Sequence, residues 1–391
     1  MDHMDNWLLY LLIVAAIGIG WWLRGRESAK QPETVGPQYY SGLNYLLNEE
    51  PDRAVAAFID ELEVNQDTLE THLALGGLLR RRGEIEKAVI VHENILSHAR
   101  LEKGAMLNVQ LELARDYLLA GLLDRAEELS ITLSREEGET RQASRQVTLE
   151  VYEVEKEWEQ AIEVAQLLAV GMESEKYEKA ISHYYCEIAS DCLAQKDFEC
   201  AREAIRDAIG HNSYNARASL ILGQTDLAEG HYAAAISALM RIKDQEPVYV
   251  PESLEALTEA FEKSDLPEQQ FRDYLEACLE LTPSISIVLS LATSMRDEIG
   301  DEAMSKYIAN HLKHNPTIRG LTQLIDLHVA NTSGVAKQNL TILRSFTEAL
   351  VADKPAYRCE DCGFKGKKLF WHCPSCRDWA TIKPIFGLEG E

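Results

Sequence analysis

A recurring spacing of small and large residues constrains the fold of this chain more than any other feature of its sequence. A first set of residues and a second set 34 positions later follow the same order: Gly42, Tyr45, Ala54 and Phe58, then Gly76, Leu79, Ala88 and His92. Between residues 38 and 355 the apolar pattern is helical and is broken every 12 to 20 residues by Gly, Pro, Asn or Asp. Self-similarity at such a period indicates stacked helical units rather than one closed core. The sequence therefore predicts an all-α array of short helices.

The period is typical of tetratricopeptide repeats, in which small residues on two paired helices let them approach closely. Further copies of the small residue of the second helix recur at intervals of 34 to 40 residues: Ala126, Ala161, Ala201 and Ala235. Three glycines are expected in the turns between paired helices: Gly83, Gly121 and Gly230. About six repeats are clear, and two or three degenerate ones follow through residues 254–283, 291–316 and 324–355. We therefore predict a repeat superhelix over residues 31–354.

Superhelices of this type present a concave groove, lined mostly by the first helix of each repeat, to a peptide or a folded partner. The candidate groove residues in the first two repeats are Tyr39, Asn44, Arg80 and Arg81. Residues 80–82 form a basic island in an acidic region, so they suit a partner carboxylate. A solvated helix end, favoured by the helix macrodipole, is the competing interpretation.

The N-terminal segment 7–23 reads WLLYLLIVAAIGIGWWL and carries no charge. As a helix it is about 25 Å long, close to the hydrocarbon thickness of a bilayer. Trp7 stands at one end of this segment, and Trp21 and Trp22 stand at the other. The acidic residues Asp2 and Asp5 precede the segment, and the basic residues Arg24, Arg26 and Lys30 follow it. This asymmetry predicts an uncleaved transmembrane anchor within residues 1–30, with the bulk of the chain on the cytoplasmic side. A cleaved signal peptide and a buried globular helix are the alternatives.

The C-terminal region contains two Cys-x-x-Cys pairs, Cys359 with Cys362 and Cys373 with Cys376. Each pair lets two thiolates face one cation, and two pairs complete a tetrahedral shell that suits one zinc or iron ion. Four protein ligands leave no coordination position for water, which indicates a structural or electron-transfer centre rather than a hydrolytic one. A module this small buries little core, so the metal is expected to supply most of its folding free energy. His372 is a competing ligand, although the four cysteines already complete the set.

Charge and the remaining cysteines narrow the range of functions. The chain carries 64 acidic against 39 basic residues, a formal net charge of −25, so most of its surface repels nucleic acid. The metal-binding module, residues 355–391, is nearly neutral, with six basic and five acidic residues, which disfavours a nucleic-acid zinc ribbon. The other cysteines fall in predicted helices and are expected to be free, buried and unreactive: Cys186, Cys192, Cys200 and Cys278. The sequence has no phosphate-loop, His-Glu-x-x-His or Gly-x-Ser-x-Gly motif, so we expect no enzymatic activity.

The order of the three parts resembles the lipopolysaccharide assembly protein B family of Gram-negative bacteria. The resemblance rests on an anchor ending in Trp-Leu-Arg-Gly-Arg, the repeat array, and a tail with Tyr-x-Cys-x-x-Cys-Gly and Cys-Pro-x-Cys, which is similar to a shortened rubredoxin. It implies a non-enzymatic adaptor on the inner membrane, facing the cytoplasm. Such an adaptor brings the lipid A deacetylase LpxC to the membrane protease FtsH and gathers other enzymes of lipopolysaccharide assembly.

Two other functions stay open at this point: rubredoxin-like electron transfer on a repeat scaffold, and nucleic-acid binding by the tail. The loop between the two cysteine pairs is much shorter than in free rubredoxins, which favours a structural metal over a redox one. The sequence also leaves open whether the module docks on the array or on a partner, and whether the chain forms a homo-oligomer.

Overall fold

The computed structural model describes residues 68–98, 101–170, 174–388 and 390–391, together with four isolated positions: Ala15, Asn44, Tyr45 and Arg53. The predicted anchor 7–23, apart from Ala15, lies outside the described residues. Within the described ranges, no helix combines the length and the apolar character that crossing a membrane requires. The chain divides into two compact units, Met1–Val151 and Tyr152–Glu391.

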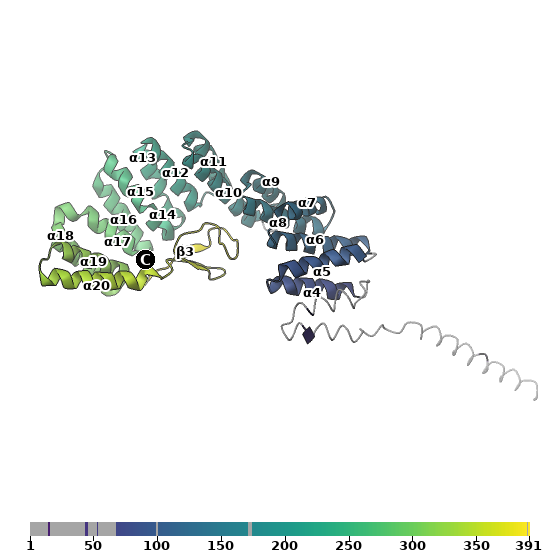
Figure 1. The fold of residues 1–391 in the computed structure, drawn as a ribbon. Coiled ribbons are helices and arrows are strands. Elements are labelled where there is room, and N and C mark those ends of the chain that lie inside the picture. Colours follow the sequence, from purple (N-terminus) through teal and green to yellow (C-terminus); the bar gives the residue numbers. More distant parts are fainter. Residues whose placement is uncertain are drawn as a thin grey trace, which may run out of the picture. The chain divides into compact units, whose positions relative to one another are not determined.

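The described part of the first unit consists of helices joined by short turns (Figure 1): α4 (Leu69–Arg81), α5 (Ile85–His98), α6 (Lys103–Leu119), α7 (Leu123–Leu133) and most of α8 (Glu139–Glu155). Consecutive helices such as α4 and α5, or α6 and α7, pack against each other, and their short connections make them antiparallel. Their inward sides bury aliphatic side chains, for example Leu79, Val91 and Ile95. In its described residues this unit therefore consists of helices and the turns between them.

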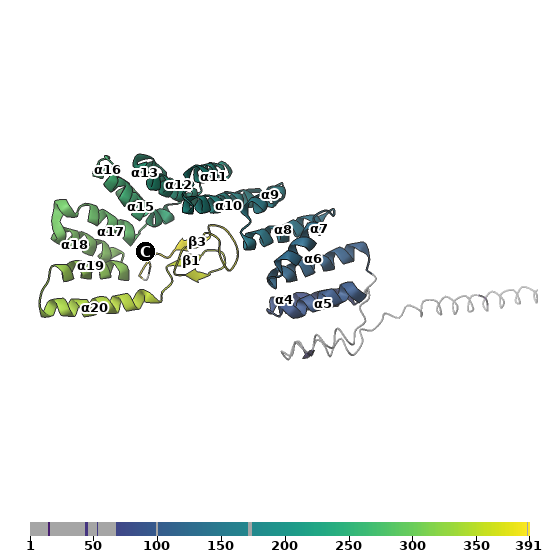
Figure 2. The same ribbon diagram turned by 45° about the horizontal axis from the view of Figure 1, so that its top comes forward.

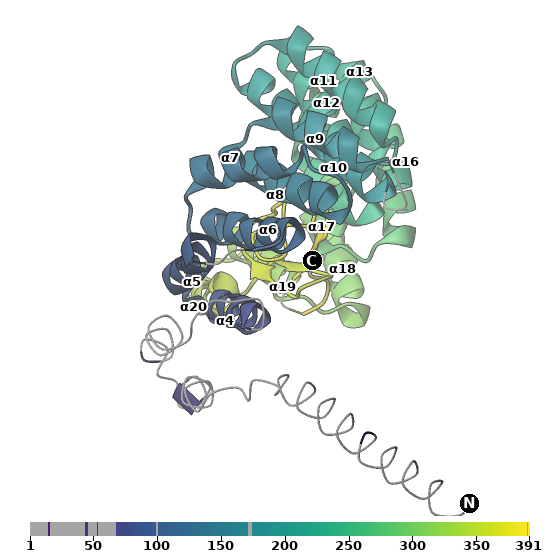
Figure 3. The same cartoon turned by 90° about the vertical axis from the view of Figure 1, so that its right-hand side faces the viewer.

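The second unit continues the same alternation and ends in a small sheet (Figure 2). Its helices are α9 (Trp158–Leu168), α10 (Ser174–Ala194), α11 (Phe198–His211), α12 (Ala216–Glu229), α13 (Tyr232–Met240), α14 (Ile242–Gln245), η1 (Pro247–Tyr249), α15 (Val250–Lys263), α16 (Glu268–Leu281), α17 (Ile285–Ser294), α18 (Arg296–His314), α19 (Ile318–Ala330) and α20 (Val335–Ala352). Figure 3 shows α12 and α13 side by side, with α11 next to α12. Helices thus also form where the repeat pattern is degenerate, beyond residue 250. The predicted helical array is confirmed for the residues described.

Close packing between paired helices explains the small residues of the repeat pattern. The alanines predicted at the second-helix position are completely buried: Ala88, Ala126, Ala161, Ala201 and Ala235. A Cβ atom added to Gly76 would lie 2.4 Å from His92 Nε2, and one added to Gly223 would lie 2.4 Å from Leu239 Cγ. Both distances are far inside van der Waals contact, so only glycine fits at these two positions unless the side chain of His92 or Leu239 moves.

The turns between paired helices adopt a left-handed backbone conformation. The predicted turn glycines Gly83, Gly121 and Gly230 have φ angles of 83°, 73° and 83°. Two equivalent turns, after α8 and after α10, use Lys156 and Lys196 instead, with φ angles of 61° and 62°. A non-glycine residue carries a cost in this region, so these two turns are imposed by the packing of the helices that they join.

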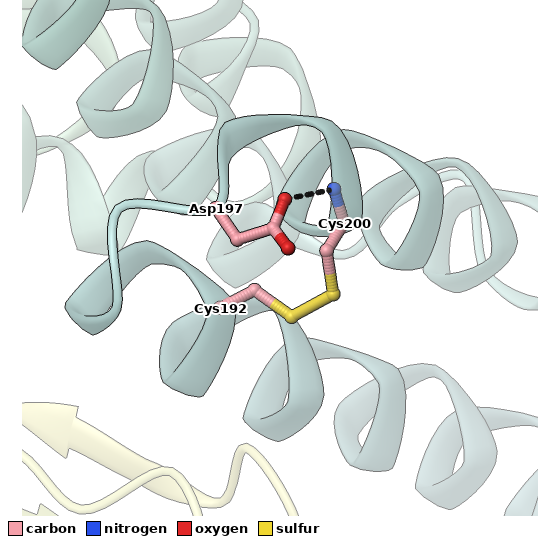
Figure 4. The surroundings of a disulfide bond; sticks show 3 residues. All are labelled: Cys192, Asp197 and Cys200. Carbon is pink, nitrogen blue, oxygen red and sulfur yellow. Dashed lines mark hydrogen bonds between the residues drawn. A yellow bond between two sulfur atoms is a disulfide. The ribbon is translucent and has the colours of Figure 1, made fainter.

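One expectation about the cysteines is wrong. Cys192 and Cys200 are not free: they form a disulfide between the end of α10 and the start of α11 (Figure 4). The tight turn between these helices brings the two Cα atoms to 5.9 Å, which is within bonding range. The side chain of Asp197 caps α11 by accepting a hydrogen bond from the Cys200 backbone N–H at 3.1 Å. Cys186 and Cys278 are free and buried, as predicted.

The C-terminal module is a three-stranded antiparallel sheet in the order β2-β1-β3. Its strands are β1 (Tyr357–Cys359), β2 (Lys365–Gly366) and β3 (Ile382–Pro384), and Tyr357 lies opposite both Gly366 and Pro384. The buried centre of this sheet is formed by Cys359, Cys373 and Ile382. So small a core does not stabilise a fold by itself, which makes the cysteine cluster the main structural feature of the module.

Candidate metal centre and its docking face

The four predicted cysteines converge on one point. Their Sγ atoms all lie within 4.8 Å of one another. The Sγ atoms of Cys359 and Cys376 are 3.7 Å apart, as are those of Cys362 and Cys373. A tetrahedral shell with metal–sulfur bonds of about 2.3 Å requires sulfur–sulfur distances of about 3.8 Å. The donor set and its spacing therefore fit one zinc or iron ion held by four thiolates.

The two cysteine pairs have the same backbone geometry. The backbone N–H of Gly363 donates to the Cys359 carbonyl at 3.1 Å, and that of Arg377 donates to the Cys373 carbonyl at 2.9 Å. Both donors have positive φ angles, 77° at Gly363 and 60° at Arg377. Glycine marks the first of these turns in the sequence, whereas arginine gives no such signal in the second.

The environment of the thiols lowers the pKa of Cys359 and raises the pKa values of Cys373 and Cys376. Burial raises the pKa of Cys359, but the hydrogen bonds that its sulfur forms with the Cys362 backbone N–H and with the Thr381 side chain help to outweigh burial, and the pKa falls to about 6. Burial raises the pKa of Cys373 and brings that of Cys376 to about 12. Four adjacent thiols do not all ionise without a compensating charge, and a cation among them supplies that charge.

His372 is not part of the sulfur cluster. Its Nε2 donates to the Arg377 carbonyl at 2.8 Å, and its ring stacks on Trp379 with centroids 4.3 Å apart. The ring thus supports the second cysteine turn from outside. The structural interpretation of this histidine is the one that the geometry supports.

Two tryptophans of the module lie against helices of the second unit. Trp379 stacks on His183 of α10 with centroids 5.3 Å apart, and its edge meets Tyr184 at 5.5 Å and Trp158 of α9 at 6.2 Å. The His183 ring also stacks on Trp371, with centroids 6.2 Å apart. An aromatic cluster of this kind joins two surfaces through both apolar burial and ring geometry.

A second group of contacts lies around η1. Trp371 packs on Tyr249 with centroids 4.7 Å apart and lies under the Arg217 guanidinium at 5.8 Å. The Tyr249 hydroxyl donates to the Ile382 carbonyl at 2.9 Å, and the Lys383 ammonium lies 4.3 Å above the Tyr249 ring. Trp158, His183, Tyr184 and Tyr249 thus belong to the surface of the array on which the module packs, which we call the docking face. This face reaches from α9 to η1.

Half-buried acidic groups complete the docking face. The indole N–H of Trp379 donates to Glu153 at 3.2 Å, and the Tyr357 hydroxyl donates to Glu252 at 2.7 Å. Glu391 accepts hydrogen bonds from the Ser284 and Ser286 hydroxyls, each at 2.8 Å. These contacts answer the question that the sequence left open: the module docks on the helical array of its own chain.

Two titratable groups of this face are shifted by burial. Burial, followed by the positive charge of Arg217, lowers the pKa of His183 well below its ordinary value, so this ring is neutral at neutral pH. Burial also raises the pKa of Glu252, against the hydrogen bond from Tyr357 that lowers it. Both groups are therefore sensitive to loss of the contact that buries them.

The predicted partner-binding residues have different environments. Tyr39 lies outside the described residues, while Asn44 is helical and exposed. Arg80 is half-buried and forms ion pairs with Glu112 and with Asp116, the latter at 2.9 Å. Arg81 is exposed at the end of α4. Their part in binding a partner stays a prediction, and Arg80 also has a structural role.

Sequence reasoning missed the residues that receive the module. Trp158, His183, Tyr184 and Tyr249 occupy ordinary core positions of helices, and only the folded chain shows that they face the metal module. A cluster of aromatic residues in helices α9 and α10 is a weak signal, because aromatic core residues are common in such repeats.

Paired helices in a repeat register, carrying a docked sheet with four converging cysteines, define the class of this protein: a tetratricopeptide-like repeat protein with a C-terminal rubredoxin-type metal module. The model of the rubredoxin metal binding domain matches residues 357–384. Lipopolysaccharide assembly protein B of Escherichia coli K12 is 36% identical over 390 residues, which cover 98% of this chain and 99% of that protein. The Haemophilus influenzae protein of the same name is 28% identical over 98% of this chain and 99% of its own. The chain belongs to the lipopolysaccharide assembly protein B family.

Proposed function

We propose that this protein is a membrane-anchored, cytoplasm-facing adaptor that regulates lipopolysaccharide synthesis and has no catalytic activity of its own. The observation that carries the proposal is the closed four-sulfur site, docked through an aromatic face on the helical array. Such a site offers no open coordination position for a substrate. The names of the relatives connect the proposal to lipopolysaccharide assembly.

The metal would act as a structural cross-link. When bound to Cys359, Cys362, Cys373 and Cys376, it ties β1 to the second cysteine turn and so stabilises the module. The protein's own residues do the rest: Trp371 and Trp379 hold the module on α10 and η1, while the turns around each cysteine pair orient the thiolates. The folded module and the array then form one surface for partners.

The proposed partners are the lipid A deacetylase LpxC, the membrane protease FtsH and other enzymes of lipopolysaccharide assembly. The segment 7–23 is proposed to be the transmembrane anchor, because its length, tryptophans and flanking charges suit an inner-membrane span. An anchored array that binds a cytosolic client raises the concentration of that client near a membrane protease without any new catalytic group.

The proposal is tested by the half-life of LpxC in cells that depend on this protein. We expect Cys359→Ser to lower the metal content and to lengthen the half-life of LpxC, while Lys365→Ala, at an exposed position of the same module, leaves both unchanged. A metal-free Cys359→Ser protein that supports a normal LpxC half-life would remove the module from the proposed function.

A second experiment separates the two ends of the adaptor. A form that begins at Gln31 is compared with the full chain by crosslinking and capture from membranes. We expect this form to retain LpxC and to lose FtsH. Turnover of a substrate by the purified chain would favour an enzymatic function. A reversible iron redox wave, together with an unchanged half-life of LpxC in the Cys359→Ser strain, would favour electron transfer.

A further inference from the structure

The last helix of the array, α20, leaves an apolar stripe exposed. Five large side chains on one side of the helix are between 46% and 71% exposed: Val335, Ile342, Leu343, Phe346 and Leu350. Their positions follow the helical period, so they form a continuous line along the helix axis. We call this set the α20 stripe.

The other side of α20 contacts α19. Thr347 is buried, and its hydroxyl accepts a hydrogen bond from the Thr322 hydroxyl of α19 at 2.9 Å. Arg344 pairs with Asp326 of α19 at 2.5 Å. In the part of the chain that the structure describes, α20 therefore packs on α19 by one side and turns the α20 stripe away from it.

The side of α20 that carries the stripe has no charged residue between Val335 and Leu350. All three charged residues of the helix, Lys337, Arg344 and Glu348, lie on the opposite side according to the helical period of 3.6 residues. A charge-free apolar face stands out in a chain whose formal net charge is −25. Repeat arrays need a polar outer face on the terminal repeat to remain soluble, and α20 does not provide one.

We propose that the α20 stripe is a self-association surface, which a second copy of this chain covers with its own α20 stripe. In a symmetric dimer each surface meets its own copy, so like charges near the axis would repel. The stripe avoids this repulsion, whereas most of the acidic surface does not.

The area of the stripe is sufficient for such a contact. The five exposed side chains present about 500 Å² of apolar surface per copy, or about 1,000 Å² for a pair, which is the lower bound for a specific interface. A lipid surface is a poorer match, because amphipathic helices that lie on membranes carry Lys or Arg beside the apolar face. By helical spacing, Asn339 lies within the α20 stripe. A polar residue inside an otherwise apolar interface between two helices fixes the register in which they pair.

The experiment is sedimentation of the full chain in a mild nonionic detergent over a range of micromolar concentrations. We expect the wild-type chain to dimerise, and Ile342→Glu to raise the dimer dissociation constant at least about 30-fold, as loss of a central interface residue does. The matched control is Leu167→Glu on α9, because Leu167 and Ile342 are both 53% exposed apolar residues. This control should dimerise like the wild type.

A second variant, Phe346→Glu, guards against an effect limited to one position and should act in the same direction. Thermal unfolding of both stripe variants should match that of the wild type, since the altered side chains point away from α19. A monomeric wild-type chain, or stripe variants that dimerise as strongly as Leu167→Glu, would overturn the proposal. If the chain associates through its anchor instead, the stripe variants will dimerise as strongly as Leu167→Glu. If the stripe binds only a different protein, the wild-type chain will be monomeric.

Discussion

In the helix pairs, a glycine lets a neighbouring side chain lie directly on the backbone, as Gly76 does for His92 and Gly223 for Leu239. In the C-terminal module, by contrast, the buried cluster of the module itself consists of only two cysteines and Ile382. The array is stabilised by contacts between neighbouring helices. The module depends on a metal and on a face that the array provides. The comparison shows that one chain can combine a fold that stabilises itself with one that requires support, and the following predictions test that difference.

Removal of the metal should have the largest effect, and it should be confined to the module. Four-cysteine sites contribute about 10–16 kcal/mol of apparent binding free energy to the folding of small zinc modules. We expect a chelator, or Cys373→Ser, to abolish protection of the amides of residues 357–384 from hydrogen exchange. The amides of α4 to α7 should keep their protection. Equal loss of protection in both regions would contradict a self-sufficient array.

Loss of a docking tryptophan should come next. Trp379→Ala removes the ring that lies against His183, Tyr184 and Trp158, and large buried aromatic residues contribute about 3–5 kcal/mol. We expect the metal site to remain formed while the module detaches from α10, seen as faster proteolysis of the segment after α20. Phe370→Ala, at a more exposed aromatic position of the module, is the control and should leave this segment resistant.

Within the array, two adjacent glycines should respond with opposite signs. A Cβ at Gly76 would meet His92 at 2.4 Å, so Gly76→Ala should lower the free energy of unfolding by about 1–3 kcal/mol. A Cβ at Gly77 has no heavy atom within 4 Å, so Gly77→Ala should raise that free energy by up to about 1 kcal/mol through helix propensity. Denaturant unfolding monitored by circular dichroism measures both. Destabilisation by both substitutions to the same degree would argue against the close approach of α4 and α5.

The smallest expected effect is a pH dependence of docking at His183. Its pKa is lowered in the folded chain by burial and by Arg217, Lys179, Lys383 and His372. Because the unfolded or undocked state binds a proton below about pH 6.5, the stability from this residue is present above that pH and is lost as the pH falls, by about 1.4 kcal/mol per pH unit.

The pH effect is measured as the difference between the wild type and His183→Gln. The stability difference between pH 7 and pH 5.5 should be smaller in the variant. Protonation of the cysteine ligands affects both proteins alike and cancels in this comparison. Identical pH profiles would show that His183 becomes protonated without leaving its site.

The sequence predicted features that depend on short spacing. The four cysteines were identifiable as a metal-binding cluster because each pair shares one turn, and the buried alanines follow from a repeat period that the helix pairs satisfy. Gly83, Gly121 and Gly230 were identifiable because a left-handed turn favours glycine. The same conformation at Lys156, Lys196 and Arg377 was not identifiable, since nothing local in those residues favours it.

The sequence by itself therefore determined the helical array, the metal-binding residues and the family, because periodic burial and ligand spacing are local properties of the chain. Only the tertiary structure decided that the module rests on its own array, since contacts such as Trp379 with Glu153 join residues 226 positions apart. It also decided that Cys192 and Cys200 are bonded and that Arg80 is held by Glu112. Such contacts depend on which helix faces meet, and a pattern along one helix does not specify its neighbour.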